Sequence, residues 1–214
     1  SGSTTGNPPP VVTVIPPAET EVCQVVSDLS FPLPVVALPE TAFGQVWPAG
    51  RLLAQAMQRF DVEGKRILEL GCGIGLASLV LQRRGADVVA SDAHPLAEVF
   101  LAYNAALNGL PALRYRQLRW DIPLPTLGRF DAIIASDVLY ERGHAELIDA
   151  VVERHASPDA EVLVTDPGRG NSARFTRLLA ERGFVVDSEH CPMNDADMPP
   201  YRGRLLHYRR RMQA

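Results

Sequence analysis

The chain has 214 residues, of which 46% are apolar and 21% are charged, and its formal net charge is −4. These values are ordinary for a globular protein with a sizeable core, and they fit one α/β domain with additional residues at its ends. The negative net charge gives no global reason to bind nucleic acid, so no nucleic-acid partner is expected. A basic cluster near the C-terminus is interpreted as a solvated strand; it comprises Arg202, Arg204, Arg209, Arg210 and Arg211.

The three cysteines, Cys23, Cys72 and Cys191, have no regular spacing. This count argues against a disulfide framework and a zinc site, and it favours a reducing compartment such as the cytoplasm. No apolar run approaches the roughly 20 residues that cross a bilayer, and the first residues lack the features of a signal peptide. We therefore expect a cytoplasmic monomer that needs no metal and does not associate with a membrane.

The first 45 residues differ in composition from the rest of the chain. Residues 1–20 hold five prolines among small polar residues, which predicts a flexible arm. Residues 21–45 alternate short apolar runs with Pro32 and Pro34, which indicates a hairpin or edge strands. From Pro48 onward apolar residues recur at helical spacing, and Gly64 is expected to end that helix.

Strands and helices then alternate to the C-terminus. The predicted strands are mostly continuous apolar runs, which is typical of strands covered on both faces. Such alternation predicts an α/β fold with a doubly wound, mostly parallel sheet and helices on both faces. Asn171 is expected to cap the last helix. The predicted strands are residues 66–70, 87–91, 113–118, 130–136, 161–165, 184–188 and 205–208, and the further helices are residues 76–84, 95–108, 143–155 and 171–182.

An acid ends or closely follows five successive predicted strands. Because ligands bind beyond the carboxyl ends of the strands in an open parallel sheet, these acids predict a single binding rim. Such a rim suits a ligand that carries hydroxyls, an amine and a cationic centre, and it suits a polyphosphate poorly. The acids are Glu69, Asp92, Asp121, Asp137 and Asp166.

The first turn at this rim carries three glycines, Gly71, Gly73 and Gly75. Glycines permit a tight strand-to-helix turn and let a ligand lie against bare backbone. The dinucleotide fingerprint would need a third glycine at position 76, where this chain has Leu76. The turn therefore predicts cofactor binding of another kind, with an ordinary tight turn as the alternative. Cys72 is interpreted as a small side chain tolerated beside the ligand rather than as a nucleophile.

The next two strand ends suggest an adenosine ligand. Asp92 lies about 20 residues beyond the first glycine, which is the offset of an acid that binds ribose hydroxyls, although it could also cap the following helix. Trp120 can pack on adenine and Asp121 can meet the exocyclic amine. A tryptophan that only fills the sheet edge is an equally good interpretation, because aromatic burial needs no ligand.

The strand that ends at Ser136 is expected at the centre of the sheet, and Asp137 and Tyr140 follow it. A carboxylate and a phenol at this position can hold an acceptor amine and orient its lone pair. Helix capping by Asp137 and packing by Tyr140 are the alternative roles. The five histidines show no metal-ligand spacing and are interpreted as surface or capping residues.

Residues 67–79, with the sequence ILELGCGIGLASL, resemble the first motif of class I, or seven-β-strand, S-adenosylmethionine-dependent methyltransferases. Residues 44–50 and 136–140 narrow the resemblance to methyltransferase family 16, a group of protein-lysine and predicted nicotinamide N-methyltransferases. The resemblance covers about residues 40 to 190. It implies a Rossmann-like sheet of seven strands whose last strand is antiparallel, a methyltransferase domain in residues 46–214, and a lid formed by residues 21–45 and 194–202.

The resemblance also implies a cofactor and site residues. The cofactor would be S-adenosyl-L-methionine, with S-adenosyl-L-homocysteine as its product and no metal. Asp137 and Tyr140 match the family's acid-x-x-Tyr motif and would be the catalytic residues that bind the acceptor. Many members have Trp-Gly where this chain has Trp120 and Asp121, so the adenine contacts depart from the family pattern. The implied cofactor-binding residues are Trp47, Glu69, Gly71, Cys72, Gly73, Asp92, Ala93, Trp120, Asp121 and Ser136.

The leading hypothesis is an N-methyltransferase that acts on a lysine side chain of a protein. The runner-up methylates a small amine such as nicotinamide; a lysine needs an open, acidic channel, whereas a small base needs a closed pocket. An adenosine-nucleotide oxidoreductase is disfavoured by Leu76. A non-catalytic scaffold is disfavoured by the intact glycine turn.

Overall fold

The structure is a computed structural model that describes residues 22–26, 29–37, 46–168, 170–193 and 201–211. The arm predicted for residues 1–20 lies outside these ranges, as do residues 27–28, 38–45 and 194–200 of the predicted lid. The lid itself therefore stays a prediction. In the part of the chain that is described, no helix combines the length and the apolar character needed to cross a membrane.

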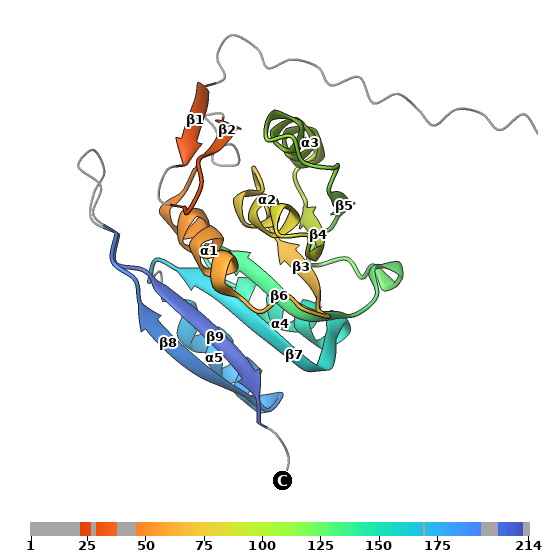
Figure 1. Ribbon diagram of the computed structural model, residues 1–214. Coiled ribbons are helices and arrows are strands. Elements are labelled where there is room, and N and C mark those ends of the chain that lie inside the picture. Colours follow the sequence, from red (N-terminus) through yellow and green to blue (C-terminus); the bar gives the residue numbers. More distant parts are fainter. Residues whose placement is uncertain (1–21, 27–28, 38–45, 169, 194–200, 212–214) are drawn as a thin grey trace, which may run out of the picture.

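The main sheet has seven strands in the order β5-β4-β3-β6-β7-β9-β8. Neighbouring strands are parallel except where β9 pairs antiparallel with β7 and with β8. This confirms the predicted seven-stranded, mostly parallel sheet with an antiparallel last strand (Figure 1). The strands are β3 (Arg66–Leu70), β4 (Asp87–Asp92), β5 (Arg114–Gln117), β6 (Phe130–Ser136), β7 (Ala156–Asp166), β8 (Phe184–His190) and β9 (Arg204–Arg210).

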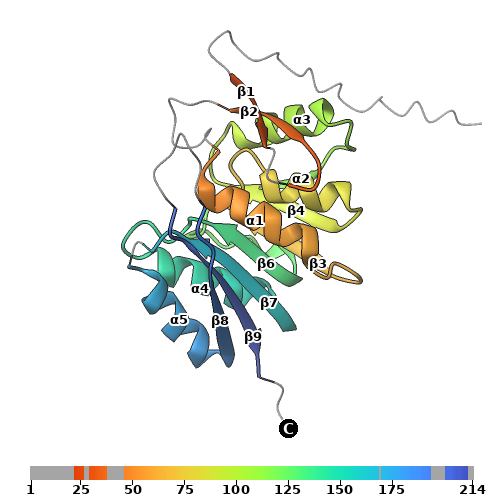
Figure 2. The same ribbon diagram turned by 60° about the vertical axis from the view of Figure 1, so that its left-hand side comes forward.

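Helices cover both faces of this sheet. Helices α1, α2 and α3 lie on one face and α4 and α5 on the other, as the two views show (Figures 1 and 2). Successive residues of β3 explain this: Ile67 packs into the core on the α1 and α2 side, whereas Leu68 packs into the core on the α4 and α5 side. The helices are α1 (Pro48–Arg59), α2 (Leu76–Arg83), α3 (Ala97–Leu107), α4 (His144–His155) and α5 (Ser172–Glu181), with a short 3₁₀ helix at Pro125–Leu127.

The N-terminal strands β1 (Val22–Val26) and β2 (Leu33–Ala37) form a separate antiparallel hairpin. Of the two interpretations of residues 21–45, the hairpin is therefore confirmed and the edge strands are wrong. The hairpin is held on α3, because Val36 N donates to Asn104 Oδ1 at 2.7 Å and Asn108 Nδ2 donates to the Pro34 carbonyl at 2.8 Å.

Strand β7 begins earlier than expected. It starts at Ala156, directly after α4, rather than at residue 161. Ala156 pairs with Phe130, and the register shifts before Ala132 pairs with Glu161. The added residues are largely polar or exposed, so a search for apolar runs misses them.

The basic C-terminal strand β9 lies inside the sheet, between β7 and β8. Leu206 and Tyr208 are buried, whereas Arg204 and Arg209 are exposed. The solvated interpretation therefore holds for the exposed arginine side chains but not for the strand, which is paired on both sides. The exposed arginines are Arg202, Arg204, Arg209 and Arg211, and Arg210 is partly buried.

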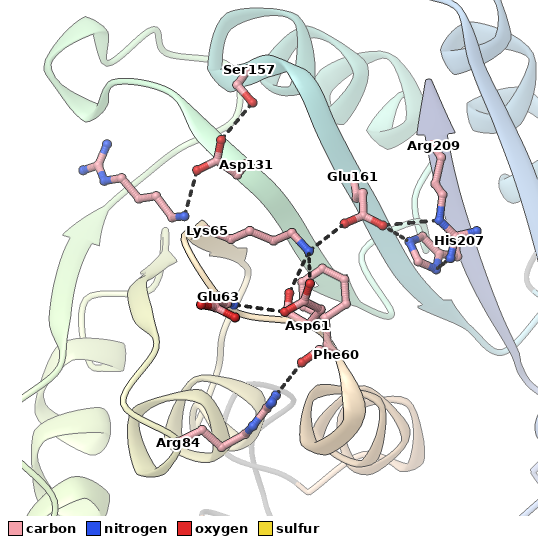
Figure 3. A network of polar contacts seen from close by, with 11 residues as sticks. Phe60, Asp61, Glu63, Lys65, Arg84, Asp131, Ser157, Glu161, His207 and Arg209 are labelled. Atoms are coloured by element: carbon pink, nitrogen blue, oxygen red, sulfur yellow. Dashed lines mark hydrogen bonds and ion pairs between the residues drawn. The ribbon is translucent and has the colours of Figure 1, made fainter. Parts of the chain in front are cut away.

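A polar network connects several elements at the end of the sheet where β3 begins (Figure 3). Lys65 Nζ donates to the Asp61 carbonyl at 2.8 Å and lies 3.4 Å from Glu161 Oε2. On the other side, Glu161 Oε1 lies 2.8 Å from His207 Nε2. The network links the turn after α1 to β7 and β9, at the end of β3 opposite to the predicted binding rim.

Candidate active site

A cavity of about 950 Å³ opens at the carboxyl ends of β3, β4, β5 and β6. Its size lies within the roughly 300–1,000 Å³ of small-molecule sites. The cavity brings together all twelve residues that the sequence predicts as catalytic or cofactor-binding. They are Trp47, Glu69, Gly71, Cys72, Gly73, Asp92, Ala93, Trp120, Asp121, Ser136, Asp137 and Tyr140.

Four of the five predicted rim acids line this cavity. The fifth, Asp166, is 2% exposed, and its Oδ2 accepts the amide of Gly168 at 2.9 Å, within the turn that follows β7. Asp166 ends β7, which runs parallel to β6, so it lies at the predicted rim but does not line the cavity. Its strand is one position farther along the sheet, beyond β6.

The glycine turn between β3 and α2 needs its glycines for two reasons. Gly71, Gly73 and Gly75 all have positive φ, at 60°, 54° and 85°. A Cβ on Gly71 would also lie 3.2 Å from Val138, and a Cβ on Gly75 would lie 2.3 Å from Leu101. A side chain is therefore both strained and crowded there, and the turn presents bare backbone to the cavity.

Asp92, at the end of β4, holds this turn in place. Its Oδ2 accepts the amide of Gly73 at 2.9 Å, and its Oδ1 accepts the amide of His94 at 2.8 Å. Each carboxylate oxygen can accept more than one hydrogen bond, so both oxygens retain capacity for a ligand's hydroxyls. Both amides lie outside α3, which begins at Ala97, so Asp92 does not cap that helix and the capping alternative is wrong. The ribose contact stays a prediction.

Glu69 lines the cavity from beneath the turn and is almost fully buried. It is 2% exposed, and its Oε2 accepts hydrogen bonds from the amide and the hydroxyl of Ser78 in α2. Burial raises the pKa of Glu69 to about 7. The carboxyl group thus anchors the start of α2, and its predicted contact with a cofactor stays a prediction.

Cys72 is 7% exposed, and burial, followed by the nearby Glu69 carboxyl, raises the pKa of its thiol well above the ordinary value. A buried, protonated thiol is a poor nucleophile. These properties support the interpretation of Cys72 as a small packing residue.

Trp120 and Asp121 form the end of the cavity beyond β5. The Trp120 ring meets the edge of the His144 ring at a centroid distance of 5.2 Å. The Asp121 carboxylate accepts two hydrogen bonds from the Arg119 guanidinium, at 3.1 and 2.8 Å, and these bonds lower the pKa of Asp121. The carboxylate is thus already paired, and its predicted contact with an exocyclic amine stays a prediction.

Asp137 and Tyr140 follow β6 in a segment, residues 137–143, that we call the acceptor loop. Asp137 has φ of 48°, and among the described residues it is the one non-glycine residue in this left-handed region. Such backbone is costly for a side chain other than asparagine, aspartate or glycine, and it clusters at functional sites. The Asp137 amide donates to the Thr165 carbonyl at 2.8 Å. No side chain caps α4, so the capping alternative for Asp137 is wrong.

Tyr140 is 53% exposed at the rim of the cavity, and its ring meets the edge of the His144 ring at 4.7 Å. Partial burial, followed by the nearby carboxylates of Glu141, Asp92 and Asp137, raises the pKa of Tyr140. The phenol is therefore protonated at neutral pH, which suits it to hydrogen bonding rather than to acting as a base.

Sequence reasoning missed His144 and Arg119, both of which line the cavity. His144 was grouped with surface or capping histidines, yet its ring separates Trp120 from Tyr140, and its Nδ1 lies 2.9 Å from the Val138 carbonyl. Its position as the first residue of the helix after β6 was the available signal, because helix starts there face the binding rim.

Comparisons with known proteins point to one family. The profile of a family described as lysine methyltransferase matches residues 39–181, which is more than half of the chain. The Protein N-lysine methyltransferase METTL21A of Danio rerio is 31% identical over 155 residues, covering 68% of this chain and 70% of that protein. The Histone-arginine methyltransferase METTL23 of Homo sapiens is 33% identical over 161 residues, covering 71% and 84% respectively.

Another relative is the Electron transfer flavoprotein beta subunit lysine methyltransferase of Mus musculus, which is 30% identical over 127 residues. The match covers 58% of this chain and 49% of that protein, so the chain spans about half of its length. Among solved structures, the 16S rRNA N2 G1207 methyltransferase RsmC of T. thermophilus superposes with a TM-score of 0.66 at 23% identity. That match covers 92% of this chain and 52% of RsmC, and it supports the Rossmann-like fold. On these grounds, the chain belongs to the lysine methyltransferase family, methyltransferase family 16.

Proposed function

We propose that this enzyme transfers a methyl group from S-adenosylmethionine to the ε-amino group of a lysine in a protein. The observation that carries the proposal is that one cavity gathers the predicted adenosine-binding groups and the predicted acceptor-binding pair. The strand order β5-β4-β3-β6 sets them out in sequence, with Trp120 at one end, Asp92 and the glycine turn in between, and Asp137 at the other end.

The residues present fit S-adenosylmethionine. Gly71 and Gly73 line the cavity and carry no side chain, so a ligand can lie directly against their backbone. We propose that Gly71 and Gly73 contact the methionine part, with Glu69, Cys72, Trp47 and Ser136 around it, that Asp92 and Ala93 hold the ribose, and that Trp120 and Asp121 flank the adenine. The cofactor supplies a methyl group on a sulfonium centre, which needs no further activation.

The protein's contribution to such a transfer is alignment. The lysine nitrogen must be neutral and must direct its lone pair at the methyl carbon. Asp137 and Tyr140 can each accept a hydrogen bond from the amine, which fixes the direction of the lone pair. The Asp137 carboxylate also stabilises the positive charge that develops on the nitrogen as its new bond forms.

The rim of the cavity favours a macromolecular acceptor over a small one. Trp47 and Tyr140 line the cavity, yet they are 41% and 53% exposed, so the acceptor end is open to a long side chain that enters from outside. A small amine would instead need a closed pocket. We further propose that the enzyme acts as a cytoplasmic monomer on protein rather than on nucleic acid, in line with the net charge of −4.

The test is transfer of tritiated methyl groups from S-adenosylmethionine into a cell lysate, with and without nuclease treatment. The expected result is a nuclease-resistant labelled protein band that contains methyllysine by mass spectrometry. Label confined to small molecules would replace this proposal with the small-amine alternative. Methylarginine in the band, or loss of the label on nuclease treatment, would reject lysine as the acceptor.

A further inference from the structure

We propose that Asn171 is a positioning residue that holds the acceptor loop and thereby sets the orientation of Tyr140. This inference deepens the proposed function and rests on it. It concerns a side chain of α5 that lies outside the cavity and that the sequence predicts only as a helix cap.

The acceptor loop needs partners from other parts of the fold. It leaves β6 through the left-handed Asp137 and has no regular secondary structure before α4 begins at His144. Its Glu141 and Gly143 carbonyls accept amides of α4, from His144 at 3.2 Å and from Leu147 at 3.1 Å. The carbonyls nearer to β6, at residues 138 and 139, need side chains or solvent instead.

Two side chains supply these partners. Asn171 Nδ2 donates to the Leu139 carbonyl at 2.8 Å and lies 3.4 Å from the Glu141 carbonyl, so it brackets Tyr140 on both sides. The Nδ1 of His144 lies 2.9 Å from the Val138 carbonyl, which makes Nδ1 the protonated nitrogen of that ring. Three carbonyls of the loop are thus bound by the side chains that begin α4 and precede α5.

The hydrogen bonding at position 171 fits this role and not helix capping. Asn171 occupies the N-cap position of α5, yet it makes no side-chain cap hydrogen bond. Aspartate or serine would cap a helix equally well, but a carboxylate has no N–H to give to a carbonyl. An amide nitrogen with two N–H groups can serve both carbonyls.

The loop backbone in turn controls Tyr140. Because its side chain is 53% exposed, packing constrains the ring little, apart from its contact with His144. A shift of the backbone at residues 139–141 therefore moves the phenol relative to the acceptor. A displacement of the phenol by about 1 Å can reduce the rate of methyl transfer by roughly tenfold to a hundredfold. It need not weaken cofactor binding.

The test compares Asn171→Asp with a matched variant in the same helix. Asn171→Asp keeps the size of the side chain and is equally compatible with the N-cap position of α5, but it lacks the donor. We expect turnover in the tritiated-methyl assay to fall by roughly tenfold or more, while the KM for S-adenosylmethionine and the Kd for S-adenosylhomocysteine stay within about twofold. Arg174→Ala removes a 2.8 Å ion pair between Arg174 and Glu146 that joins α5 to α4 without touching the loop, so it should leave turnover unchanged.

Hydrogen exchange provides a readout that does not depend on the acceptor. In Asn171→Asp, amides of residues 137–143 should exchange faster than in the parent chain, while those of the glycine turn should not change. Asn171→His offers an N–H donor near the position of the lost amide nitrogen and should restore much of the turnover and the slow exchange.

Wild-type turnover and unchanged loop exchange in Asn171→Asp would overturn the inference, as would an equal loss of cofactor affinity. A parent chain that binds S-adenosylhomocysteine but labels no protein would defeat the proposed function instead, and the exchange comparison would still decide the role of Asn171. If Asn171→Asp does not fold, Asn171→His tests the inference instead. The inference then requires that Asn171→His retains turnover and slow amide exchange in the acceptor loop.

Discussion

The two halves of the cavity are held together in different ways. In the cofactor half, the glycine turn is held by a neighbour in the chain: the hydrogen bond from the Gly73 amide to Asp92 spans 19 residues, within one strand-helix-strand unit. The acceptor half depends on distant elements, because the bond from Asn171 to the Leu139 carbonyl spans 32 residues and joins the start of α5 to the loop after β6. Substitutions in the two halves should therefore have separable effects. Those in the cofactor half should change cofactor affinity, and those in the acceptor half should change turnover.

The largest effect is expected for Asp92→Ala, in the cofactor half. The variant removes the acceptor of the Gly73 and His94 amides and also the proposed ribose contact. Since hydrogen bonds to a charged group contribute about 1.5–3 kcal/mol each, the Kd for S-adenosylhomocysteine should rise by roughly a thousandfold. Calorimetry measures this Kd, and an unchanged value in a folded variant would show that Asp92 does not bind the cofactor.

The second effect concerns stability and also belongs to the cofactor half. The pKa of Glu69 is raised from 4.5 to about 7 by burial. Below pH 4.5 the carboxyl is protonated in both folded and unfolded chains. Between pH 4.5 and 7 the unfolded chain ionises first, so this contribution to stability is lost as the pH rises, by up to about 3 kcal/mol.

Glu69→Gln keeps an acceptor for Ser78 but cannot ionise, so it should lack this part of the pH dependence. Urea unfolding at pH 5 and pH 8 measures the difference between the two proteins. If wild type and Glu69→Gln lost the same stability over this range, the carboxyl would have an ordinary pKa in the folded chain.

The third effect tests the acceptor half. Asp137→Asn tolerates the left-handed backbone at φ 48° but removes the negative charge. Turnover should fall by about a hundredfold, while the Kd for S-adenosylhomocysteine stays within about twofold. A parallel loss of cofactor affinity would remove the proposed separation between the halves.

A smaller effect is expected for Tyr140→Phe, which keeps the ring contact with His144 but lacks the hydroxyl. The loss of one neutral hydrogen bond to the amine should reduce turnover by about tenfold. Initial rates at saturating S-adenosylmethionine measure it. Unaltered rates would assign Tyr140 to packing, which was its alternative role.

The smallest effect is expected for Cys72→Ala, because its thiol is buried and held in the protonated form. Turnover and cofactor affinity should both remain within about twofold. A loss of activity comparable to that of Asp137→Asn would give Cys72 a chemical role.

The difference between the cofactor half and the acceptor half also explains what could be predicted from the sequence. The glycine turn and Asp92 follow a fixed local spacing, and the strand ends follow from apolar runs, so the mostly parallel sheet and the strand-end residues of the cavity could be predicted from the chain itself. Trp47, Ala93 and Ser136 followed only from the family resemblance. The start of β7 could not be predicted, because residues 157–159 interrupt the apolar run and Ala156 joins the strand through its pairing with Phe130.

The contacts of the acceptor half were out of reach for a similar reason. Nothing near Asn171 in the sequence reveals that its amide bonds to Leu139 rather than to its own helix. The role of His144 depends on the packing of α4 against β6, which brings three rings together from separate segments. Such contacts are set by tertiary packing rather than by local spacing.

A crystal structure of the full chain with S-adenosylhomocysteine bound tests the central claim most directly. We expect the ribose hydroxyls on the Asp92 carboxylate, the methionine part over Gly71 and Gly73, and the sulfur atom facing Asp137 across the cavity. A ligand bound outside this cavity, or bound in reverse with its adenine beside Asp137, would contradict the division into a cofactor half and an acceptor half.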